Sequence, residues 1–289
     1  MRPEAIIISD NPDADYKPGF NLTLSPPEWQ GYSHELRDVG WFWQASFNLV
    51  RPDEELEEFF ETGLNRAIEV YSRRGQAIWE GWINEMTFRR GGAELRRGFG
   101  KTANRVWVRY SDSTGGGNRS DAVEDERSIE LYGIKEKPLG GGQMLGSSQA
   151  LRVANTYLNM VRYPENPSIT VTGGRQSSRR PALEIRCSGW WHKLYWRVFN
   201  DPDAPSSRTL TAQVQRVFSV VEWPVDGDFD YNGSATPAPA DADMWAADVL
   251  LNCAKQGDAN FDRWIVGIGP ARVPYYRRAV ATRLPEVVE

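Results

Sequence analysis

The sequence predicts an α+β fold in three blocks: a β-barrel-like N-terminal domain over residues 1–110, an α+β second domain over 111–225, and a C-terminal docking segment over 226–289. Several alternating runs and a single helix pattern fill the first block, which is typical of a small, partly closed β-barrel. Helix and strand patterns mix in the second block. The stretch SDSTGGGNRSD separates these two blocks, and TPAPADAD is typical of a linker before a last helix.

The central element of the first block is a β-hairpin over Ala67 to Phe88, AIEVYSRRGQAIWEGWINEMTF. Strand-forming residues lie on both sides of a short polar turn that contains Gly75, which is the sequence signal for a hairpin. Its large apolar side chains are too many for an isolated two-stranded ribbon, which is at best marginally stable. We therefore expect the hairpin to be scaffold that packs against neighbouring strands, not a reactive site.

A long strand and a helix precede this hairpin. The segment 34–50 predicts one half-buried strand, because large and polar side chains alternate after Gly40. One face of the strand holds Trp41, Trp43, Ala45, Phe47 and Leu49, and the other holds Phe42, Gln44, Ser46 and Asn48. The segment 52–62 predicts a helix that starts at a proline, carries acids in its first turn and ends at Gly63. Its inward side chains are Leu56, Phe59 and Phe60.

Shorter signals fill the rest of the chain. We expect strands at 6–8, 20–24, 104–110, 134–137, 168–172, 182–188, 190–199 and 261–269, with a final short strand or arm beyond Arg278. We expect helices at 121–131, 147–162 and 240–255. The helix at 147–162 has a serine as its predicted cap, and its predicted inward side chains are Leu151, Ala154, Leu158 and either Met160 or Val161. The segment 210–221 fits a helix or a strand equally well.

Composition restricts the class of protein. The chain has 289 residues, of which 40% are hydrophobic and 25% charged, and this is ordinary for a globular protein. Its net charge of −5 lacks the overall basic signature of a nucleic-acid binder. The count of twelve tryptophans is high, and it fits either subunit interfaces or an exposed glycan groove.

The two cysteines, Cys187 and Cys253, lack the spacing of a zinc site, and we expect both to be buried free thiols. The apolar run near the N-terminus is too short for a signal peptide, and no stretch approaches the roughly 20 apolar residues of a membrane span. The sequence therefore predicts a soluble protein without a membrane segment.

Two local patterns suggest ligand chemistry but have plainer explanations. Four arginines, Arg89, Arg90, Arg96 and Arg97, form a basic cluster that could bind phosphate. Nearby acids favour a solvated or subunit-contacting patch instead. The glycines of SDSTGGGNRSD lack the lysine and the spacing of a phosphate-binding loop, so that stretch is a linker or a loop tip.

A third pattern suggests calcium. Asp228, Asp230 and Asn232, followed by Gly233, match the opening of a calcium-binding loop, in which oxygen ligands alternate along the chain. The position of the closing glutamate holds Pro239, although Asp241 or Asp243 could close the site from outside the standard register. The partial match favours a polar surface loop over a calcium site, so we expect no cofactor and keep calcium as the alternative.

The only histidines, His34 and His192, lie in different predicted blocks, and no hydrolase or metalloprotease signature surrounds either of them. We expect both to be structural or surface histidines. The sequence therefore predicts that the protein is not an enzyme.

A family resemblance covers roughly residues 32–220. In order, the phrases that carry it are ELRDVGWFWQASFNL, PDEELEEFF, GLNRAIEVYSRRGQAIWEGWINEM, NRVWVRYSD, DERSIELYGIKE, SSQALRVANTYL and LEIRCSGWWHKLYWRVF. This order of elements resembles the tail-hub, or baseplate hub, proteins of tailed bacteriophages. It is a pattern of elements and short phrases without a catalytic signature.

The resemblance implies a structural role in the virion, at the tail tip or baseplate, after synthesis in the host cytoplasm. It implies β-barrel-like hub domains with α/β insertions, assembled as a homotrimer that adapts the sixfold tail tube to a threefold tip around a DNA ejection channel. The implied partners are further copies of the chain, the distal tail protein or tail-tube ring, tail-tip or fibre proteins and the tape-measure protein, with viral DNA present only in transit. A net negative chain suits such a conduit, because like charges keep DNA from adhering.

A carbohydrate-binding or host-receptor module of a tail tip is the alternative from another class. It would use the Trp-rich segment, particularly Trp190, Trp191 and Trp196. A cell-wall hydrolase is disfavoured by the missing site motif. Oligomeric state distinguishes the first two, because a hub needs closed threefold symmetry and glycan modules often work as monomers.

Overall fold

The computed structural model describes residues 3–90, 93–111, 115–143, 146–164, 168–171, 182–201, 208–235, 244–260 and 262–279. The chain forms two compact units, the first comprising Met1–Leu36 with Phe42–Arg197 and the second Arg37–Trp41 with Val198–Glu289. Each unit mixes helices with strands, which confirms the predicted α+β class. These units do not follow the predicted boundaries after residues 110 and 225.

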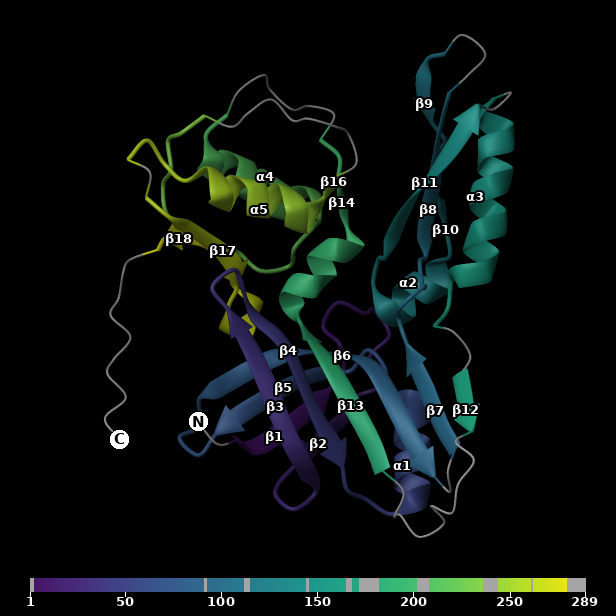
Figure 1. Ribbon diagram of the computed structural model, residues 1–289, viewed down its shortest axis with the longest axis vertical. Coiled ribbons are helices and arrows are strands. Elements are labelled where there is room, and N and C mark those ends of the chain that lie inside the picture. Colours follow the sequence, from purple (N-terminus) through teal and green to yellow (C-terminus); the bar gives the residue numbers. More distant parts are fainter. Residues whose placement is uncertain are drawn as a thin grey trace. The chain divides into compact units, whose positions relative to one another are not determined.

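The first unit is built on a large sheet. Its hydrogen-bonded path runs β4-β13-β6-β5-β1-β2, with β3 beside β4, β7 beside β6 and β12 beside β7 (Figure 1). The strands are β1 (Pro3–Ser9), β2 (Asn21–Leu24), β3 (Trp29–Arg37), β4 (Gly40–Leu49), β5 (Ala67–Ser72), β6 (Ala77–Arg90), β7 (Ala93–Gly98), β12 (Ser168–Val171) and β13 (Ala182–Gly189).

The predicted central hairpin is confirmed as β5 and β6, with Gly75 at φ +71° in the turn. Strand β6 also joins two parts of the sheet, because its first half pairs with β5, its second half pairs with β7, and β13 pairs along its other edge. The end of β13 approaches both of its neighbours so closely that glycine is required at two positions. A Cβ at Gly81 of β6 would lie 2.2 Å from the Ser188 carbonyl oxygen of β13, and one at Gly189 of β13 would lie 1.7 Å from the Phe42 carbonyl oxygen of β4.

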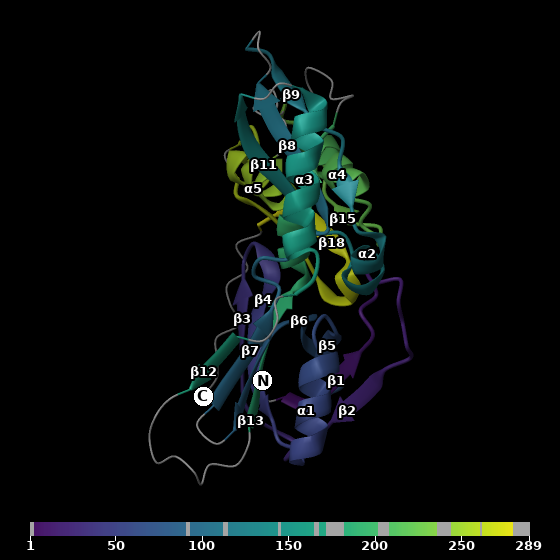
Figure 2. The ribbon, with the colours of Figure 1, turned by 90° about the vertical axis from the view of Figure 1, so that its right-hand side faces the viewer.

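Helix α1 (Asp53–Thr62) packs against β6 and β13, and Figure 2 shows it lying along the sheet. The prediction for this helix is confirmed at both ends and on its inner face. Pro52 precedes the acidic first turn, and the Gly63 amide donates to the Phe59 carbonyl oxygen at the C-terminal end. The buried side chains are Leu56, Phe59 and Phe60.

The single strand predicted over 34–50 is wrong, because β3 ends at Arg37 and β4 begins at Gly40 after a tight turn. The predicted alternation of side chains between the two faces of the strand is also wrong at the start of β4. Phe42 is buried, and so are Ala45, Phe47 and Leu49, whose positions have the opposite parity. The alternation therefore changes phase between Phe42 and Ala45, which lets Phe42 pack near Trp79, with ring centroids 6.3 Å apart.

An α/β insertion lies between β7 and β12. It contains β8 (Arg105–Ser111), β9 (Gly117–Arg119), β10 (Val123–Glu124), α2 (Glu126–Tyr132), β11 (Glu136–Gln143) and α3 (Ser147–Val161). Strands β8 and β11 are parallel, and α3 covers one face of this small sheet (Figures 1 and 2). The insertion has a core of its own, made by Ala103, Val106, Val108, Ala150, Ala154 and Leu158.

Two details of the helices in the insertion differ from prediction, and one open alternative is resolved. Gly146, not a serine, occupies the N-cap of α3. Met160 is 77% exposed, so Val161 is the one of the two alternatives that supplies the inward contact at that end. The predicted helix over 121–131 begins later, at Glu126, because Val123 and Glu124 pair with β8. The Asp125 carboxylate caps α2 by accepting from the Ser128 amide at 2.8 Å.

The strand predicted over 190–199 is wrong for most of its length. Residues Trp190–Trp196 form the 3-10 helix η1, and only Val198–Phe199 form a strand, β14. Trp191 and Leu194 are three positions apart and both fully buried, which is a helical spacing that the dense aromatic run conceals. Trp196 packs on Trp82 and Phe99, with ring centroids 4.7 and 5.4 Å away.

In the second unit, helix α4 (Leu210–Val220) resolves the segment that fitted a helix or a strand, and the Thr209 hydroxyl caps it. Helices α4 and α5 (Ala246–Gln256) lie side by side (Figure 1). The strands of this unit are β14, β15 (Asp228–Phe229), β16 (Met244–Trp245), β17 (Trp264–Ile268) and β18 (Pro274–Arg278). Strand β17 also pairs with Gly40 and Trp41 at the start of β4.

Candidate functional site

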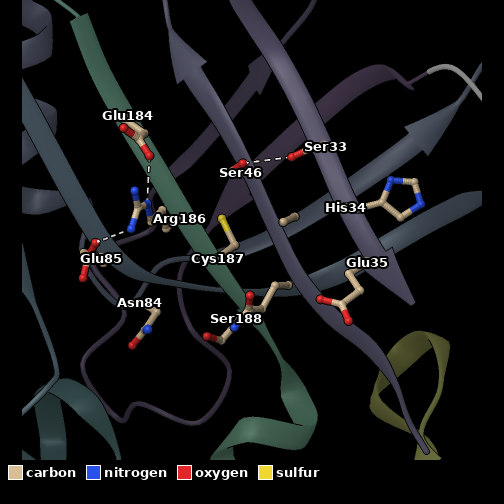
Figure 3. Close-up of a pocket in the computed structure, with 12 residues that line it drawn as sticks. Ser33, His34, Glu35, Ser46, Asn84, Glu85, Glu184, Arg186, Cys187 and Ser188 are labelled. Atoms are coloured by element: carbon tan, nitrogen blue, oxygen red, sulfur yellow. Dashed lines mark hydrogen bonds and ion pairs between the residues drawn. The ribbon is translucent and has the colours of Figure 1, made fainter. Parts of the chain in front are cut away.

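A polar pocket of about 550 Å³ lies on the exposed face of β3, β4, β13 and β6 (Figure 3). Four neighbouring strands each contribute two or more side chains to it, so the pocket is part of the sheet and not of a loop. Its lining residues are Ser33, His34, Glu35, Gln44, Ala45, Ser46, Asn84, Glu85, Glu184, Arg186, Cys187 and Ser188.

Strand β13 determines which side chains face this pocket. Leu183 and Ile185 are buried on the core side, so Glu184 and Arg186 point to the exposed face. The pairing with β6 then shifts after Arg186, where a bulge places Cys187 opposite Ile83. The extra residue of this bulge is Asn84 of β6. Cys187 keeps the alternation of Leu183 and Ile185, and it is buried at the base of the pocket.

Charged side chains form a ladder across β7, β6 and β13. The Arg186 guanidinium contacts Glu184 at 2.8 Å and Glu85 at 3.3 Å, as Figure 3 shows. Burial alone would raise the pKa of Glu184, but hydrogen bonds and charge from Arg186 and Arg89 hold that pKa below its ordinary value. The ladder continues through Arg89 to Glu94 at 2.9 Å. The Glu184 carboxylate therefore stays ionised in the folded chain at neutral pH.

The predicted basic cluster is part of the same arrangement. Arg89 and Arg96 contact carboxylates of the ladder, which raises the pKa of each guanidinium. Arg90 contacts Glu57 of α1, and Arg97 donates to the Glu61 carbonyl oxygen at 2.8 Å. All four arginines thus have acceptors within the first unit, which fits the solvated-patch interpretation better than a phosphate site.

The protonation states and orientations of the titratable groups in the pocket suit noncovalent binding better than covalent catalysis. Burial raises the pKa of the Cys187 thiol well above its ordinary range, so the thiol is protonated at neutral pH. Burial lowers the pKa of His34, and its imidazole points away from Cys187 in Figure 3. The Ser33 and Ser46 hydroxyls hydrogen-bond each other at 3.0 Å. The pocket offers carboxylates, hydroxyls and amides to a polar or basic partner segment.

The buried amine of Lys193, which no sequence pattern predicted, contacts two residues that line a second pocket of about 370 Å³. The Lys193 ammonium is 3.2 Å from the Asn65 amide oxygen and 3.4 Å from the Tyr132 carbonyl oxygen. It also lies 3.9 Å from the ring centre of Trp196 and 4.4 Å from that of Trp82. These contacts link η1 to the end of α2, so Lys193 connects the insertion to the main sheet. A lysine within the run WWHKLYW was the available signal.

Lys135 is a second amine in the same region. Burial, together with the charge of Lys137, lowers the pKa of Lys135 to about 8. Its ammonium donates to the Phe99 carbonyl oxygen at 2.5 Å and lies 4.7 Å from the centre of the Trp196 ring. Two cationic side chains therefore contact the same indole where the insertion joins the sheet.

The three residues predicted as calcium ligands have different environments. Asp228 is exposed in β15, which pairs with β18, and one Asp230 carboxylate oxygen accepts from the Arg278 amide at 3.3 Å. Asn232 is buried, and its side-chain amide donates to the Gly257 carbonyl oxygen and the Tyr276 hydroxyl, both at 3.0 Å. Asp241 and Asp243 lie outside the described residues. The absence of a cofactor stays the prediction and calcium the alternative, and titration calorimetry with calcium chloride distinguishes them.

Within the described ranges, no three or more His, Cys, Asp or Glu side chains are grouped so that they could hold a metal ion. Both cysteines are free and buried, as predicted. His34 packs near Tyr32 and His192 near Trp43, with ring centroids 5.5 and 4.4 Å apart.

The tryptophans named for a glycan site lie in the protein interior. Trp190, Trp191 and Trp196 are all buried in η1, and none of the twelve tryptophans, all of which lie in described residues, is exposed. A glycan-binding surface stacks sugars on exposed rings, so it would need side chains other than these three. Their environment indicates core packing.

Comparison with known protein families, with curated proteins and with solved structures finds no match to this chain. None of the described helices is both long enough and apolar enough to span a lipid bilayer.

Proposed function

We propose that the chain is a structural protein of a bacteriophage tail tip, a hub that assembles as a homotrimer and adapts a sixfold tail tube or distal tail ring to a threefold tip. The proposal includes a central channel through which viral DNA passes, and β-barrel-like hub domains as the scaffold of each subunit. It places the protein in the virion, at the tail tip or baseplate.

One observation carries the proposal: the phrases on which the family resemblance rests are neighbours in space. GWFWQASFNL forms β4, which pairs with ALEIRCSG of β13, and β13 pairs with AIWEGWINEM of β6. AIEVYS of β5 pairs with the other edge of β6. The phrases of the insertion are also in contact, since α3 and β11 both pack on β8. The phrases therefore make up the sheet scaffold of the first unit and its insertion, which is the part of the chain that the proposal assigns to the hub.

The chemistry of the sheet face supports an assembly role. The charged ladder of β7, β6 and β13 and the adjoining polar pocket present donors and acceptors in a fixed register. Such a surface suits protein partners, because charge patterns control which subunits meet and in which orientation. The proposed partners are the ring above, tip or fibre proteins below, and the tape-measure protein in the channel.

A non-enzymatic role is part of the same proposal. It is supported by the protonation of the Cys187 thiol and by the orientation of His34 away from that thiol (Figure 3). A nucleophilic cysteine needs a lowered pKa and a base within hydrogen-bond reach.

The test is the mass of the purified protein in solution, measured by light scattering over a range of concentrations. We expect three times the chain mass of 32.8 kDa, either for the protein alone or after addition of the upstream tail ring protein. A strict monomer that ignores the ring protein and binds host-surface glycans would overturn the hub and favour the receptor-binding alternative.

A further inference from the structure

The pocket of about 370 Å³ is lined by four separate segments of the first unit. These are the loop between β1 and β2, the end of α1 with the residues that lead into β5, strand β7, and the end of α2. Helix α2 belongs to the insertion, whereas the other three segments belong to the main sheet and its covering helix. The pocket is therefore a cavity between two substructures, and small molecules commonly bind in such concave sites.

Two guanidinium groups line this pocket, those of Arg66 and Arg97. The end of α1 holds both of them, because Arg66 Nε donates to the Thr62 carbonyl oxygen at 3.3 Å and Arg97 donates to the Glu61 carbonyl oxygen at 2.8 Å. Such contacts cap the C-terminus of a helix. Capping occupies a single N–H group of Arg97, so most of the donors of this side chain are left for a ligand.

A phenol lies near each guanidinium. Burial raises the pKa of Tyr132 and the charge of Arg97 opposes this rise, so the Arg97 guanidinium lies near the Tyr132 hydroxyl. Burial lowers the pKa of Arg66, and Asp10 and Tyr16 oppose that change. In the part of the chain that the structure describes, neither phenol hydroxyl forms a hydrogen bond. Guanidinium and hydroxyl donors therefore converge on the same cavity.

The charged groups that line the pocket, or that hydrogen-bond to a side chain lining it, leave one positive charge in excess. The cations are Arg66, Arg97 and Lys193, and the carboxylates are Asp10 and Glu61. This local excess occurs in a chain with a net charge of −5. A carboxylate ligand carries a single negative charge and balances it. A phosphate monoester carries about −1.5 to −2 at pH 7 and would leave the site negative.

The rest of the pocket wall is apolar. Ala14, Leu64 and Leu131 contribute aliphatic surface, and the rings of Tyr16 and Tyr132 add to it. An inorganic anion would leave this surface in contact with water, whereas a ligand with an apolar body would cover it. The pocket therefore suits a molecule with an anionic end and an apolar body.

We propose that this pocket binds a small monocarboxylic acid with an apolar body, whose carboxylate accepts hydrogen bonds from Arg97 and Tyr132. Arg97 is the main anchor, because its acceptor among the described residues is a neutral carbonyl oxygen, whereas Arg66 already pairs with Asp10. Hydrogen bonds from a guanidinium to a carboxylate are stronger than those between neutral groups.

This inference goes beyond the proposed hub function and does not depend on it. The pocket is made by one copy of the chain, so a monomer can bind the acid as well as an assembled subunit can. A chain that is monomeric at every concentration but binds the acid would overturn only the hub. A trimer that binds no acid would overturn only the assignment of this pocket.

The first experiment titrates the purified chain with 4-phenylbutyrate and with octanoate by isothermal calorimetry. We expect a dissociation constant of about 1 mM or tighter for at least one of these acids. The control ligand is 4-phenylbutyramide, which has the same shape without the charge and should bind at least about tenfold more weakly. If neither acid shows saturable binding, or if the amide binds as tightly as its acid, the proposal is overturned. Equal competition by inorganic phosphate would overturn the choice of a carboxylate.

A pair of variants locates the binding. Arg97→Gln removes the proposed anchor, and Arg96→Gln is the matched control, because Arg96 is the preceding residue of β7 and contacts Glu85 on the opposite face of the sheet. We expect Arg97→Gln to raise the dissociation constant at least about tenfold and Arg96→Gln to leave it unchanged. Equal effects of the two substitutions would contradict the assignment. Tyr132→Phe keeps the ring and tests the hydroxyl by itself, with a smaller rise expected.

A third variant should strengthen binding, which a purely structural role would not explain. The Glu61 side chain lines the pocket and is exposed, and its carboxylate repels an anion. Glu61→Gln removes this repulsion and keeps the backbone carbonyl that accepts from Arg97, so we expect the dissociation constant to fall about threefold. Glu58→Gln, on an exposed residue of the same helix outside the pocket, is the control. Unchanged or weaker binding by Glu61→Gln would count against a carboxylate in this pocket.

Discussion

Helices α1 and α3 cover the two sheets of the first unit in the same way and yet present opposite surfaces. Each helix buries three side chains, Leu56, Phe59 and Phe60 in α1 and Ala150, Ala154 and Leu158 in α3. The outer side of α1 carries six carboxylates in ten residues, whereas α3 carries one guanidinium in fifteen.

The comparison separates two physical demands on a covering helix. The size of the inner side chains matches the space between helix and sheet. Leucine and phenylalanine side chains fill that space under α1, whereas alanines let α3 lie closer to its sheet. The outer side chains depend on whether the helix faces water or another protein surface. Carboxylates are costly to remove from water, so the outside of α1 favours solvent, while the outside of α3 loses little on contact with protein.

Removing volume beneath α1 should have the largest effect. Leu56→Ala deletes a fully buried side chain and leaves a cavity among large neighbours, so we expect a loss of about 3 kcal/mol in the free energy of unfolding. Urea unfolding followed by circular dichroism measures it. Val153→Ala, on the exposed side of α3, is the control, and a similar loss for both would mean that α1 is not the better-packed helix.

Adding volume beneath α3 should have the next largest effect on the free energy of unfolding. Ala154→Leu forces a larger side chain into the contact with β8, so we expect a loss of about 2 kcal/mol from overpacking. The same measurement applies, with Asn155→Leu on the exposed side as the matched control. If Ala154→Leu stabilises the chain, the close approach of α3 to its sheet is not tight.

Lys135, which lies where the insertion joins the main sheet, should have a smaller effect on the free energy of unfolding, and this effect should depend on pH. The pKa of Lys135 is about 8 in the folded chain and 10.5 as its ordinary value. Between these values the unfolded chain binds more protons, so this group makes stability rise with pH there, by at most about 1.4 kcal/mol per pH unit. Below pH 8 the lysine is charged in both states and its contribution is constant.

We therefore expect the difference in unfolding free energy between wild type and Lys135→Met to change between pH 8 and 10.5, in favour of the wild type as pH rises. Urea titrations at pH 7, 8, 9 and 10 measure it. Taking the difference removes the titration of other lysines and of the tyrosines. A difference that stays constant across this range would contradict the lowered pKa of Lys135.

The charged side chains on the outer side of α1 should have the smallest effect on the free energy of unfolding. Arg90 contacts Glu57 and lies 3.7 Å from Asp53, and all three side chains are well exposed. We expect Arg90→Gln to cost less than about 1 kcal/mol, because solvent screens exposed ion pairs. The loss should shrink further in 1 M salt. A loss above 2 kcal/mol that resists salt would show that the outside of α1 is a buried contact.

Local patterns predicted much of this fold because their causes are local. The end signals of α1, the turn of the β5–β6 hairpin and the buried period of α3 each depend on residues within a few positions. The charged ladder was visible in part, as a cluster of arginines near acids. Its arrangement was not, because Glu184 and Glu85 meet Arg186 only through the pairing of β13 with β6.

The sequence by itself determined the α+β class, both ends of α1, the central hairpin and the buried thiols. Tertiary structure alone decided that β6 pairs with two strands on one edge, that the run after Gly189 turns into a 3-10 helix, and that Lys193 is buried against Trp196. The physical reason is the separation along the sequence between the residues that interact. A turn or a helix cap is stabilised by its neighbours in sequence, whereas a buried ammonium or a shared strand depends on partners that only the folded chain brings together.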